Sequence, residues 1–403
     1  MASAAAPLSG LRIAHVTDFY HPRVGGIENH VASLARAQRA AGHRVEVITA
    51  GGVVERDGSP VDTGTARSGS ARESFCRSGI RAAHRAVTDG RYDIVHVHAG
   101  LATPLAFSTA GACSRAGTPT VVTMHSMVGD YAACYRQLDR FVGWRRWPVV
   151  FTAVSAVAAG DLQVAVGDAA PVFVLPNATE VDTWRGAPIG PHEGVVVAAV
   201  MRLTARKRPL PLLRILHRAR QAAPAAIGLR AVIVGDGPYR RPMERYLARH
   251  GMASWVSLPG VGSRNDIRAL FERSDLFVAP ALKESFGIAA LEARAAGLPV
   301  VAHERTGIGE FVEHGVSGLL VDGDAAMATA IATLASDTVT RARLTRHNRA
   351  VAPPFGWAEA LDRTAEIYRL ARAIQGSDRA ATATPMPVGP GTAARHRPNV
   401  LSA

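Results

Sequence analysis

The chain reads Lys283-Glu284-Ser285-Phe286-Gly287-Ile288-Ala289-Ala290-Leu291-Glu292-Ala293, with two carboxylates eight residues apart. The apolar run over residues 275–280, just before it, is typical of a buried parallel strand. The Ala- and Leu-rich sequence that follows predicts a helix ending near Gly297. We therefore expect Glu284 in the strand-to-helix turn and Glu292 two turns into the helix, roughly 12 Å away at about 1.5 Å of rise per residue.

Free main-chain amides at the start of this helix form a candidate anion site, because helix N-termini attract negative charge. A nucleoside-diphosphate sugar fits the layout, with Glu284 on sugar hydroxyls, the amides on the diphosphate and Glu292 on the ribose diol. Spacing alone leaves open an ordinary α/β turn that carries two solvated glutamates. The donor-binding residues predicted in this segment are Ser285, Phe286, Gly287, Ile288 and Glu292.

Two cations follow a second strand-like run, residues 194–200. Arg202 and Lys207 would lie at the carboxyl edge of a parallel sheet, where open α/β folds bind ligands. Lysine is scarce, since Lys207 and Lys283 are the only two and arginine supplies the other 44 of 46 basic residues. A lysine kept here indicates a compact point charge for a phosphate.

The composition favours a two-domain α/β protein. With 403 residues, 48% of them apolar, the chain is long enough for two hydrophobic cores. No apolar stretch of about 18 residues occurs, the N-terminal residues do not form a signal peptide, and three cysteines lack pairing or metal-site spacing. We therefore expect a cytoplasmic protein with no cofactor.

The formal net charge of +13 narrows the possible partners to nucleic acid, anionic lipid or a phosphate-rich substrate. Neither zinc-finger spacing nor an RNA-binding signature occurs, so we expect no nucleic-acid partner. Residues 136–148 mix arginine with phenylalanine and tryptophan, as membrane-interface segments do. The alternative is a surface helix that packs its aromatic side chains inward.

Alternation of apolar runs and helical patterns predicts two parallel sheets. A polar, glycine- and proline-containing stretch marks the expected linker, and a Gly/Ser/Thr-rich segment over 52–74 predicts a mobile loop. The expected divisions are an N-terminal domain over 1–184, a linker over 185–193, a C-terminal domain over 194–356, a last helix over 357–375 and a disordered tail over 376–403.

Several short motifs occur in a fixed order along the chain. They are Gly25-Gly26-Ile27-Glu28, Asp93-Ile94-Val95-His96-Val97-His98, Thr123-Met124-His125, Val154-Ser155, Pro176-Asn177-Ala178, Arg202 with Lys207, Val234-Gly235-Asp236-Gly237-Pro238, Glu284 with Glu292, and Gly315-Val316-Ser317-Gly318-Leu319-Leu320. With these motifs the chain resembles the retaining GT-B glycosyltransferases of family 4 from about residue 11 to about residue 370. It departs from the family pattern over residues 306–310, where a Gly-Gly before a Pro-Glu is common.

The resemblance implies a GT-B fold, in which two Rossmann-like domains face each other across an interdomain cleft. The N-terminal domain would bind the acceptor, the C-terminal domain would bind the nucleotide sugar, and the last helix would cross back onto the N-terminal domain. The reaction implied is metal-independent sugar transfer with retention of configuration, in which Arg202 and Lys207 stabilise the departing diphosphate. No Asp-x-Asp is placed like the metal motif of the other major glycosyltransferase fold.

Glu284 has two conceivable roles. As a nucleophile it would need a second carboxyl about 5–5.5 Å away, as in retaining glycosidases, and Glu292 is expected much farther away. The resemblance favours a front-face reaction in which the departing phosphate acts as base and Glu284 holds the hydroxyls of the donor sugar.

The N-terminal half supplies the other predicted site residues. By resemblance His125 would touch the reacting sugar or the acceptor, rather than being a structural histidine at a strand end. His96 and His98 look like a metal pair but lack a third ligand, so we interpret His98 as lining the acceptor side and His96 as packing or hydrogen bonding. The loop after the first strand carries acceptor-side candidates Asp18 and His21, followed by the phosphate-approaching glycines Gly25 and Gly26 and the acceptor-side candidate Glu28.

The opening motif is most similar to the branch that transfers N-acetylglucosamine to phosphatidylinositol. This implies a UDP- or GDP-linked donor and a lipid- or inositol-type acceptor, with peripheral contact at the inner face of an anionic membrane. The alternatives are a nucleotide-sugar epimerase or phosphorylase on the same fold, and a non-catalytic nucleotide-sugar-binding protein. A dinucleotide dehydrogenase is disfavoured because no G-x-G-x-x-G follows the first strand.

Overall fold

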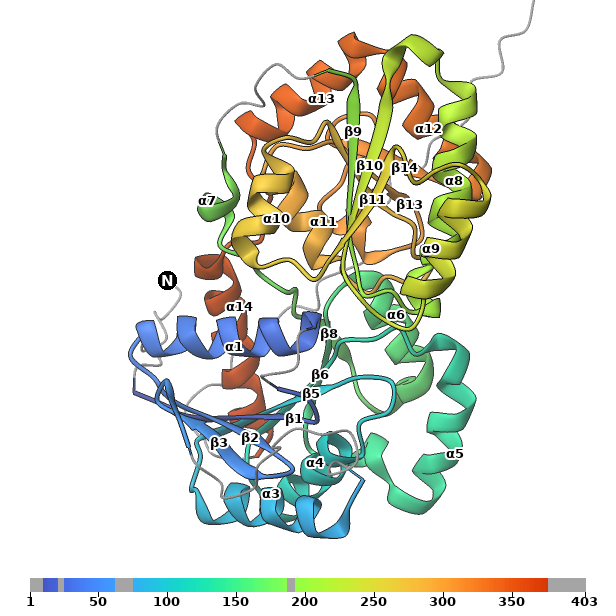
Figure 1. Ribbon diagram of the computed structural model, residues 1–403. Coiled ribbons are helices and arrows are strands. Elements are labelled where there is room, and N and C mark those ends of the chain that lie inside the picture. The colour runs from blue at the N-terminus through green and yellow to red at the C-terminus, as the bar shows by residue number, and fades with distance from the viewer. Residues whose placement is uncertain (1–9, 21–24, 62–74, 187–192, 376–403) are drawn as a thin grey trace, which may run out of the picture.

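The computed structural model describes residues 10–20, 25–61, 75–186 and 193–375. These residues form two lobes, each built on a sheet (Figure 1). The predicted tail over 376–403 and most of the predicted linker lie outside the described residues.

The N-terminal lobe contains an eight-stranded sheet in the order β4-β3-β2-β1-β5-β6-β7-β8. Its strands are parallel except for β3 and β4 at one edge. Their bounds are β1 Arg12–Thr17, β2 Arg44–Thr49, β3 Gly52–Arg56, β4 Ser59–Pro60, β5 Ile94–Ala99, β6 Thr120–Met124, β7 Val150–Ala153 and β8 Val172–Val174. The helices of this half of the chain are α1 Gly26–Ala40, α3 Arg77–Asp89, α4 Pro104–Ala116, α5 Ala132–Val142, α6 Ala156–Val166 and the short α7 Val181–Trp184.

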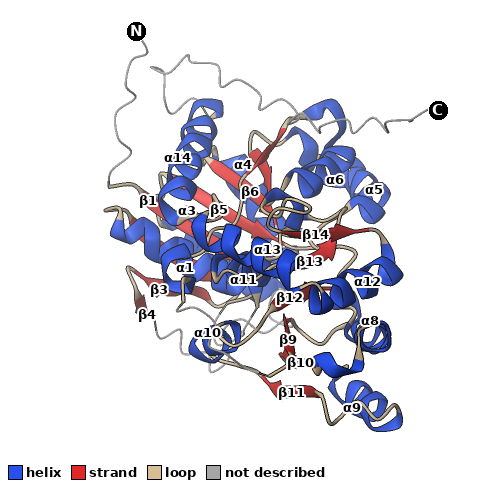
Figure 2. Ribbon diagram, turned by 90° about the horizontal axis from the view of Figure 1, so that it is seen from above, coloured by secondary structure: helices blue, strands red, loops and turns tan. Residues whose placement is uncertain are grey.

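The C-terminal lobe contains a six-stranded parallel sheet in the order β11-β10-β9-β12-β13-β14. Its strands are β9 Val195–Val200, β10 Leu229–Val234, β11 Val256–Gly260, β12 Leu276–Ala279, β13 Val300–His303 and β14 Gly318–Val321. Its helices are α8 Pro209–Ala222, α9 Arg240–Arg249, α10 Arg264–Phe271, α11 Ile288–Ala295, α12 Gly323–Ser336 and α13 Thr338–Ala350. Figure 2 shows helices on both sides of these strands. The predicted α/β class with two parallel sheets is confirmed.

The last helix, α14 (Trp357–Ile374), belongs to the N-terminal lobe in space. It contacts β5, β6 and β7 and lies beside α1, although it follows the whole C-terminal lobe in sequence (Figure 1). Ile367, Tyr368 and Ala371 of this helix are buried in the same hydrophobic cluster as Ile13, Ile94 and Val121.

The sheet face beneath α14 is unusually polar. Side chains alternate between faces along a strand, so His96 and His98 of β5 share one face with His15 of β1. The strand register pairs His15 with His96, His98 with Thr123, and Thr123 with Thr152. All five side chains are buried, and each therefore needs a hydrogen-bond partner inside the protein.

The predicted mobile loop over 52–74 is wrong in its first part. Residues 52–60 instead form β3 and β4, which extend the sheet at its edge. Asp57 and Gly58 both have positive φ, 46° and 92°, which is the backbone of a tight hairpin turn. The Asp-Gly pair was the available signal. The rest of the segment, 62–74, lies outside the described residues.

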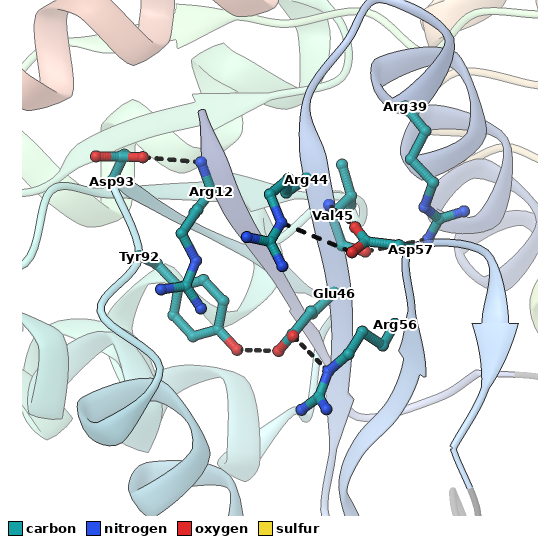
Figure 3. Close-up of polar contacts among 9 residues, drawn as sticks. All are labelled: Arg12, Arg39, Arg44, Val45, Glu46, Arg56, Asp57, Tyr92 and Asp93. Carbon is teal, nitrogen blue, oxygen red and sulfur yellow. Dashed lines mark hydrogen bonds and ion pairs between the residues drawn. The ribbon is translucent and has the colours of Figure 1, made fainter. Parts of the chain in front are cut away.

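Polar contacts hold the N-terminal ends of β1 and β2 (Figure 3). The Tyr92 hydroxyl donates to Glu46, and Arg56 Nε donates to the same carboxylate at 2.7 Å. The main-chain N–H groups of Arg12 and Val45 donate to the carboxylates of Asp93 and Asp57. These contacts satisfy strand-end amides that lack ladder partners.

Candidate active site

A cavity of about 410 Å³ lies between the two lobes. It sits at the carboxyl ends of β9 and β12, adjacent strands that mark the point where the strand order of the second sheet reverses. Open α/β sheets bind ligands at this position. The N-terminal lobe contributes Gly26, Ile27, His125, Ser126 and Asn177, and the C-terminal lobe contributes residues of 200–207, 277–281 and 283–290.

Lys207 and Glu284 form an ion pair in this cavity. Lys207 Nζ donates to Glu284 Oε2 at 2.5 Å, and the side chains are 30% and 14% exposed. Lys207 lies in a single turn after β9 and Glu284 in the loop after β12. Because β9 and β12 are neighbours, their carboxyl ends bring together two residues that are 77 positions apart.

Arg202 also lines the cavity, with an exposed side chain. Its segment is held by the loop after β10, because Met201 N donates to Val234 O and Leu203 N donates to Asp236 O. Gly235 has a φ of 139°, and a Cβ there would lie 1.8 Å from Met201 O. The Val234-Gly235-Asp236-Gly237 motif therefore allows close backbone packing that fixes Arg202.

The N-termini of α11 and α1 meet at the cavity. A Cβ on Gly26 would lie 4.0 Å from Ile288 Cδ1, across the gap between the lobes. Gly287, with a φ of 92°, precedes α11 and is wedged against Ile308, where a Cβ would lie 2.7 Å from Cγ1. Within the described part of the chain, nothing accepts a hydrogen bond from the amides of Gly287, Ile288 or Ala289. Two positive helix ends thus converge on one space.

Direct contacts bridge the two lobes around this cavity. Ser285 Oγ donates to the main-chain carbonyl of His125 at 2.7 Å. Ala156 N, at the start of α6, donates to Glu310 Oε1 at 2.6 Å, and Lys283 pairs with Asp130. Residues 306–310, where the chain departs from the family pattern, thus reach the opposite lobe through Glu310.

Glu292 is not among the residues that line the cavity. It is the fifth residue of α11, so the prediction that it lies two turns into the helix is wrong, because the helix begins at Ile288. Burial raises the pKa of the Glu292 carboxyl to about 8; the charge of Arg264 opposes this rise and that of Glu180 adds to it. Its carboxyl is therefore largely protonated at neutral pH.

His125 lies at the cavity wall on the end of β6, nearly buried. Its Nε2 is 3.0 Å from His98 Nδ1, and burial lowers the pKa of His125 to about 3, so the ring is neutral. His98 was expected to line the acceptor side. That expectation is wrong, because His98 is buried behind His125 and both of its ring nitrogens are hydrogen-bonded.

The acceptor-side candidates on the first loop are distributed differently from the prediction. Asp18 is buried, and its carboxylate accepts from Leu105 N at 3.2 Å and Ala106 N at 3.0 Å, which caps the start of α4. Glu28 is buried too, with its carboxylate folded back against Gly25. His21 lies outside the described residues.

Sequence reasoning missed two features of this region. Asn177 lines the cavity, and its Oδ1 is buried without a hydrogen-bond partner among the described residues, so it offers an acceptor to a ligand. His15 joins His96 and His98 in a buried trio whose donor atoms lie within 4.8 Å of one another. All six ring nitrogens already have hydrogen-bond partners, so the trio is a satisfied polar core rather than a set of free metal ligands.

Comparison with known proteins gives the family. A model described as Glycosyltransferase Family 4 matches residues 24–183, and one described as Glycosyl transferases group 1 matches residues 181–351. The D-inositol 3-phosphate glycosyltransferase of Salinispora arenicola is 31% identical over 342 residues, which cover 76% of this chain and 75% of that protein. A phosphatidylinositol N-acetylglucosaminyltransferase component from Arabidopsis thaliana is 25% identical, with 92% of this chain and 83% of that protein covered.

Solved structures show the same fold. Anabaena HepE in complex with UDP-glucose has a TM-score of 0.69 and 21% identity, over 88% of this chain and 98% of that one. The sucrose-phosphate synthase of Thermosynechococcus elongatus has a TM-score of 0.69 and 19% identity, over 90% and 99%.

Proposed function

This chain belongs to the family 4 glycosyltransferases of GT-B fold, and from that membership we propose a specific reaction. It moves a sugar from a UDP- or GDP-linked donor to a hydroxyl of an inositol- or lipid-linked acceptor, with retention of configuration and without a metal ion. The observation that carries the proposal is the Lys207–Glu284 pair beneath two converging helix N-termini.

The groups around the cavity match the charges of such a donor. A departing nucleoside diphosphate gains negative charge, and in the proposed reaction Lys207, Arg202 and the amides at the start of α11, all of which line the cavity, stabilise it. Lys207 can exchange its carboxylate partner for a phosphate oxygen, which frees Glu284 to accept hydrogen bonds from the sugar hydroxyls.

The number of carboxylates supports front-face chemistry. Among the described residues that line the cavity, Glu284 is the only one with a carboxylate. A double displacement needs a second carboxyl about 5–5.5 Å away, and a divalent cation prefers several oxygen ligands. In the proposed step the acceptor oxygen bonds to the anomeric carbon as the bond from that carbon to the phosphate oxygen breaks. The acceptor proton passes to the departing phosphate.

We assign the ribose diol to Glu292, which does not line the cavity but lies one turn along α11 from Ile288, which does, and the acceptor to the N-terminal side of the cavity, near His125 and Asn177. The inositol-type acceptor rests on what the relatives' names say they act on, and the UDP donor on the ligands of the solved neighbours. The proposal includes contact with an anionic membrane at its inner face, through α5. Leu138, Phe141 and Val142 of that helix are exposed.

The test combines product chemistry with matched variants. The full chain is incubated with UDP-, GDP- and ADP-sugars, with inositol 3-phosphate and phosphatidylinositol as acceptors, and with either Mg²⁺ or EDTA. We expect an α-linked product from an α-linked donor, at the same rate in EDTA. An inverted product, or a rate abolished by EDTA, would contradict the proposed mechanism, and conversion of the donor sugar without acceptor would favour an epimerase.

Glu284→Ala should lower kcat at least a hundredfold while nucleotide binding persists, because the lost contacts are to the sugar. Lys207→Ala should lower kcat and also weaken nucleotide binding. Arg214→Ala, which removes an exposed cation on α8 away from the cavity, should change neither.

A further inference from the structure

A buried chain of hydrogen bonds leads away from the cavity wall. His125 Nε2 contacts His98 Nδ1 at 3.0 Å, and His98 Nε2 contacts His15 Nδ1 at 2.9 Å. The other nitrogen of that ring, His15 Nε2, contacts Gln38 Oε1 at 2.7 Å. His15, His98 and Gln38 are at most 1% exposed, so no solvent competes for these contacts.

The chain continues through the C-terminal helix. Gln38 Nε2 donates to the Tyr368 hydroxyl of α14 at 2.9 Å. That hydroxyl is 3.0 Å from His96 Nδ1, and His96 Nε2 is 2.7 Å from Thr123 Oγ1. The helix that follows the C-terminal lobe is therefore linked to the cavity wall through hydrogen bonds alone.

The far end of this chain of hydrogen bonds agrees with one direction of donation, the one that the Gln38 amide sets. Thr123 Oγ1 is 2.6 Å from Thr152 Oγ1, and the Thr152 hydroxyl donates to the carbonyl of Val122 at 3.4 Å. Either threonine hydroxyl can donate in the 2.6 Å contact, but when Thr152 gives its proton to the carbonyl, which only accepts, it accepts from Thr123. Thr123 then has no proton for His96, which must donate through Nε2 and accept through Nδ1.

The same direction holds on the other side of Tyr368. The Gln38 amide nitrogen can only donate, so the Tyr368 hydroxyl accepts from it and gives its own proton to His96 Nδ1. Gln38 then turns its oxygen to His15, which donates through Nε2 and accepts through Nδ1. His98 therefore donates through Nε2 to His15 and accepts through Nδ1. His125 must then donate to His98 through Nε2.

Each histidine holds one ring proton in this scheme, so all must be neutral. Burial lowers the pKa of His15 to about 4 and of His125 to about 3, and it holds the pKa values of His96 and His98 well below the usual range. The opposite direction would need the Gln38 amide turned around and would leave the carbonyl of Val122 without the Thr152 proton.

We propose that this chain of hydrogen bonds fixes His125 as its Nε2–H tautomer, so that Nδ1 presents a lone pair to the substrate. Within the described residues Nδ1 has no partner, and the ring lies at the cavity wall. Resting on the proposed function, His125 accepts a hydrogen bond from a sugar or acceptor hydroxyl and does not donate to the departing phosphate. His98, His15, Gln38 and Tyr368 are positioning residues for that lone pair.

The experiment reads the tautomer directly in the full chain labelled with ¹⁵N-histidine. Long-range ¹H–¹⁵N spectra separate the Nε2–H and Nδ1–H tautomers, and the signals of His125 are identified by their loss in His125→Gln. We expect Nε2–H in the parent protein. Tyr368→Phe, at a residue that does not line the cavity, should give a mixture of tautomers, and kcat should fall several-fold with the donor KM nearly unchanged.

Tyr135→Phe is the matched control, because it removes the hydroxyl of another buried tyrosine, one that donates to Leu101 O at 2.8 Å outside the chain. It should retain the parent tautomer and kcat. Thr152→Val interrupts the chain of hydrogen bonds at its far end, and it is used in place of Tyr368→Phe if that variant does not fold. Nδ1–H at His125 in the parent, or an unchanged tautomer in both chain variants, overturns the inference. If no nucleotide sugar is a donor, the proposed function fails while the spectra still decide the tautomer.

Discussion

The hydroxyl of Ser285 in the C-terminal lobe donates to the main-chain carbonyl of His125 in the N-terminal lobe at 2.7 Å. This bond ties the segment that carries Glu284 to the strand end that carries His125. The Ser285 side chain thereby links the two halves of the proposed site through the main chain of His125, independently of the tautomer of the His125 ring.

Ser285→Ala should therefore weaken the alignment of the lobes. A hydrogen bond of this kind contributes about 1 kcal/mol, so we expect kcat/KM for transfer to fall roughly fivefold. Ser336→Ala is the control, because Ser336 Oγ also donates to a main-chain carbonyl, that of Ala332, far from the cleft. Equal losses in both variants would show that Ser285 contributes to stability only.

Donor binding should release a proton near neutral pH. The pKa of Glu292 is raised to about 8, chiefly by burial, whereas a carboxylate is the form that accepts hydrogen bonds from both ribose hydroxyls. Calorimetry of UDP binding at pH 7, in buffers that differ in ionisation enthalpy, measures the protons released. We expect close to one in the parent and none in Glu292→Gln. The same count in both proteins would remove Glu292 from the ribose site.

The raised pKa also affects folding. A carboxyl whose pKa is higher in the folded state contributes stability below about pH 4.5, and this contribution is lost as the pH rises toward 8. The free energy of unfolding of the parent minus that of Glu292→Gln should therefore decrease from pH 5 to pH 8, as denaturant titrations of both proteins measure. Parallel curves for the two proteins would contradict the assignment.

The buried histidines should make the protein sensitive to mild acid. His15, His30, His96, His98 and His125 all have pKa values lowered by burial, so they take up protons only on unfolding. Their neutral forms contribute stability above about pH 6.5, which is lost as the pH falls toward 4. At about 1.4 kcal/mol per histidine and pH unit, the five together remove about 7 kcal/mol by pH 5.5.

Denaturant titrations between pH 7 and pH 5 test this, because the slope of the unfolding free energy against pH counts the protons taken up. We expect a slope near four protons below pH 6, because the five histidines take up nearly five protons on unfolding while Glu292 releases about one. A slope below one proton would mean that these histidines are charged in the folded protein.

Helix α5 should bind anionic vesicles. Phe141 is 88% exposed, and Leu138 and Val142 are exposed beside Arg136 and Arg140. Leu138→Ser with Phe141→Ser should reduce flotation with phosphatidylglycerol vesicles at least tenfold, without changing the melting temperature. Val339→Ser on α13, which is 78% exposed, is the control and should bind as the parent does. Equal binding to phosphatidylcholine would point to apolar contact without charge recognition.

The fold and part of the site could be predicted because their signals are local. Buried parallel strands appear as apolar runs, and Lys207 and Glu284 each follow such a run, so they had to meet if the strands were neighbours. The sequence left open whether the aromatic side chains of 136–148 face outward or pack inward, and the structure shows one of each. Trp144 is 1% exposed and packs inward, whereas Phe141 faces outward.

The remaining features depend on pairings between distant residues, which leave no periodic pattern in the sequence. Asp18 was expected to bind an acceptor, but it caps α4. His98 sits on an alternating strand and could have faced either a ligand or the core. Tyr368 meets His96 across 272 positions, and nothing near either residue in the sequence indicates this contact.

The return of α14 to the N-terminal sheet sets the order in which the newly made chain can mature. The polar sheet face around His96 and Gln38 lacks its Tyr368 partner until that residue has been synthesised and has left the ribosome. By then the whole C-terminal sheet has already emerged. The N-terminal half, although made first, is thus completed last. A ribosome that stops before α14 leaves this polar sheet face exposed.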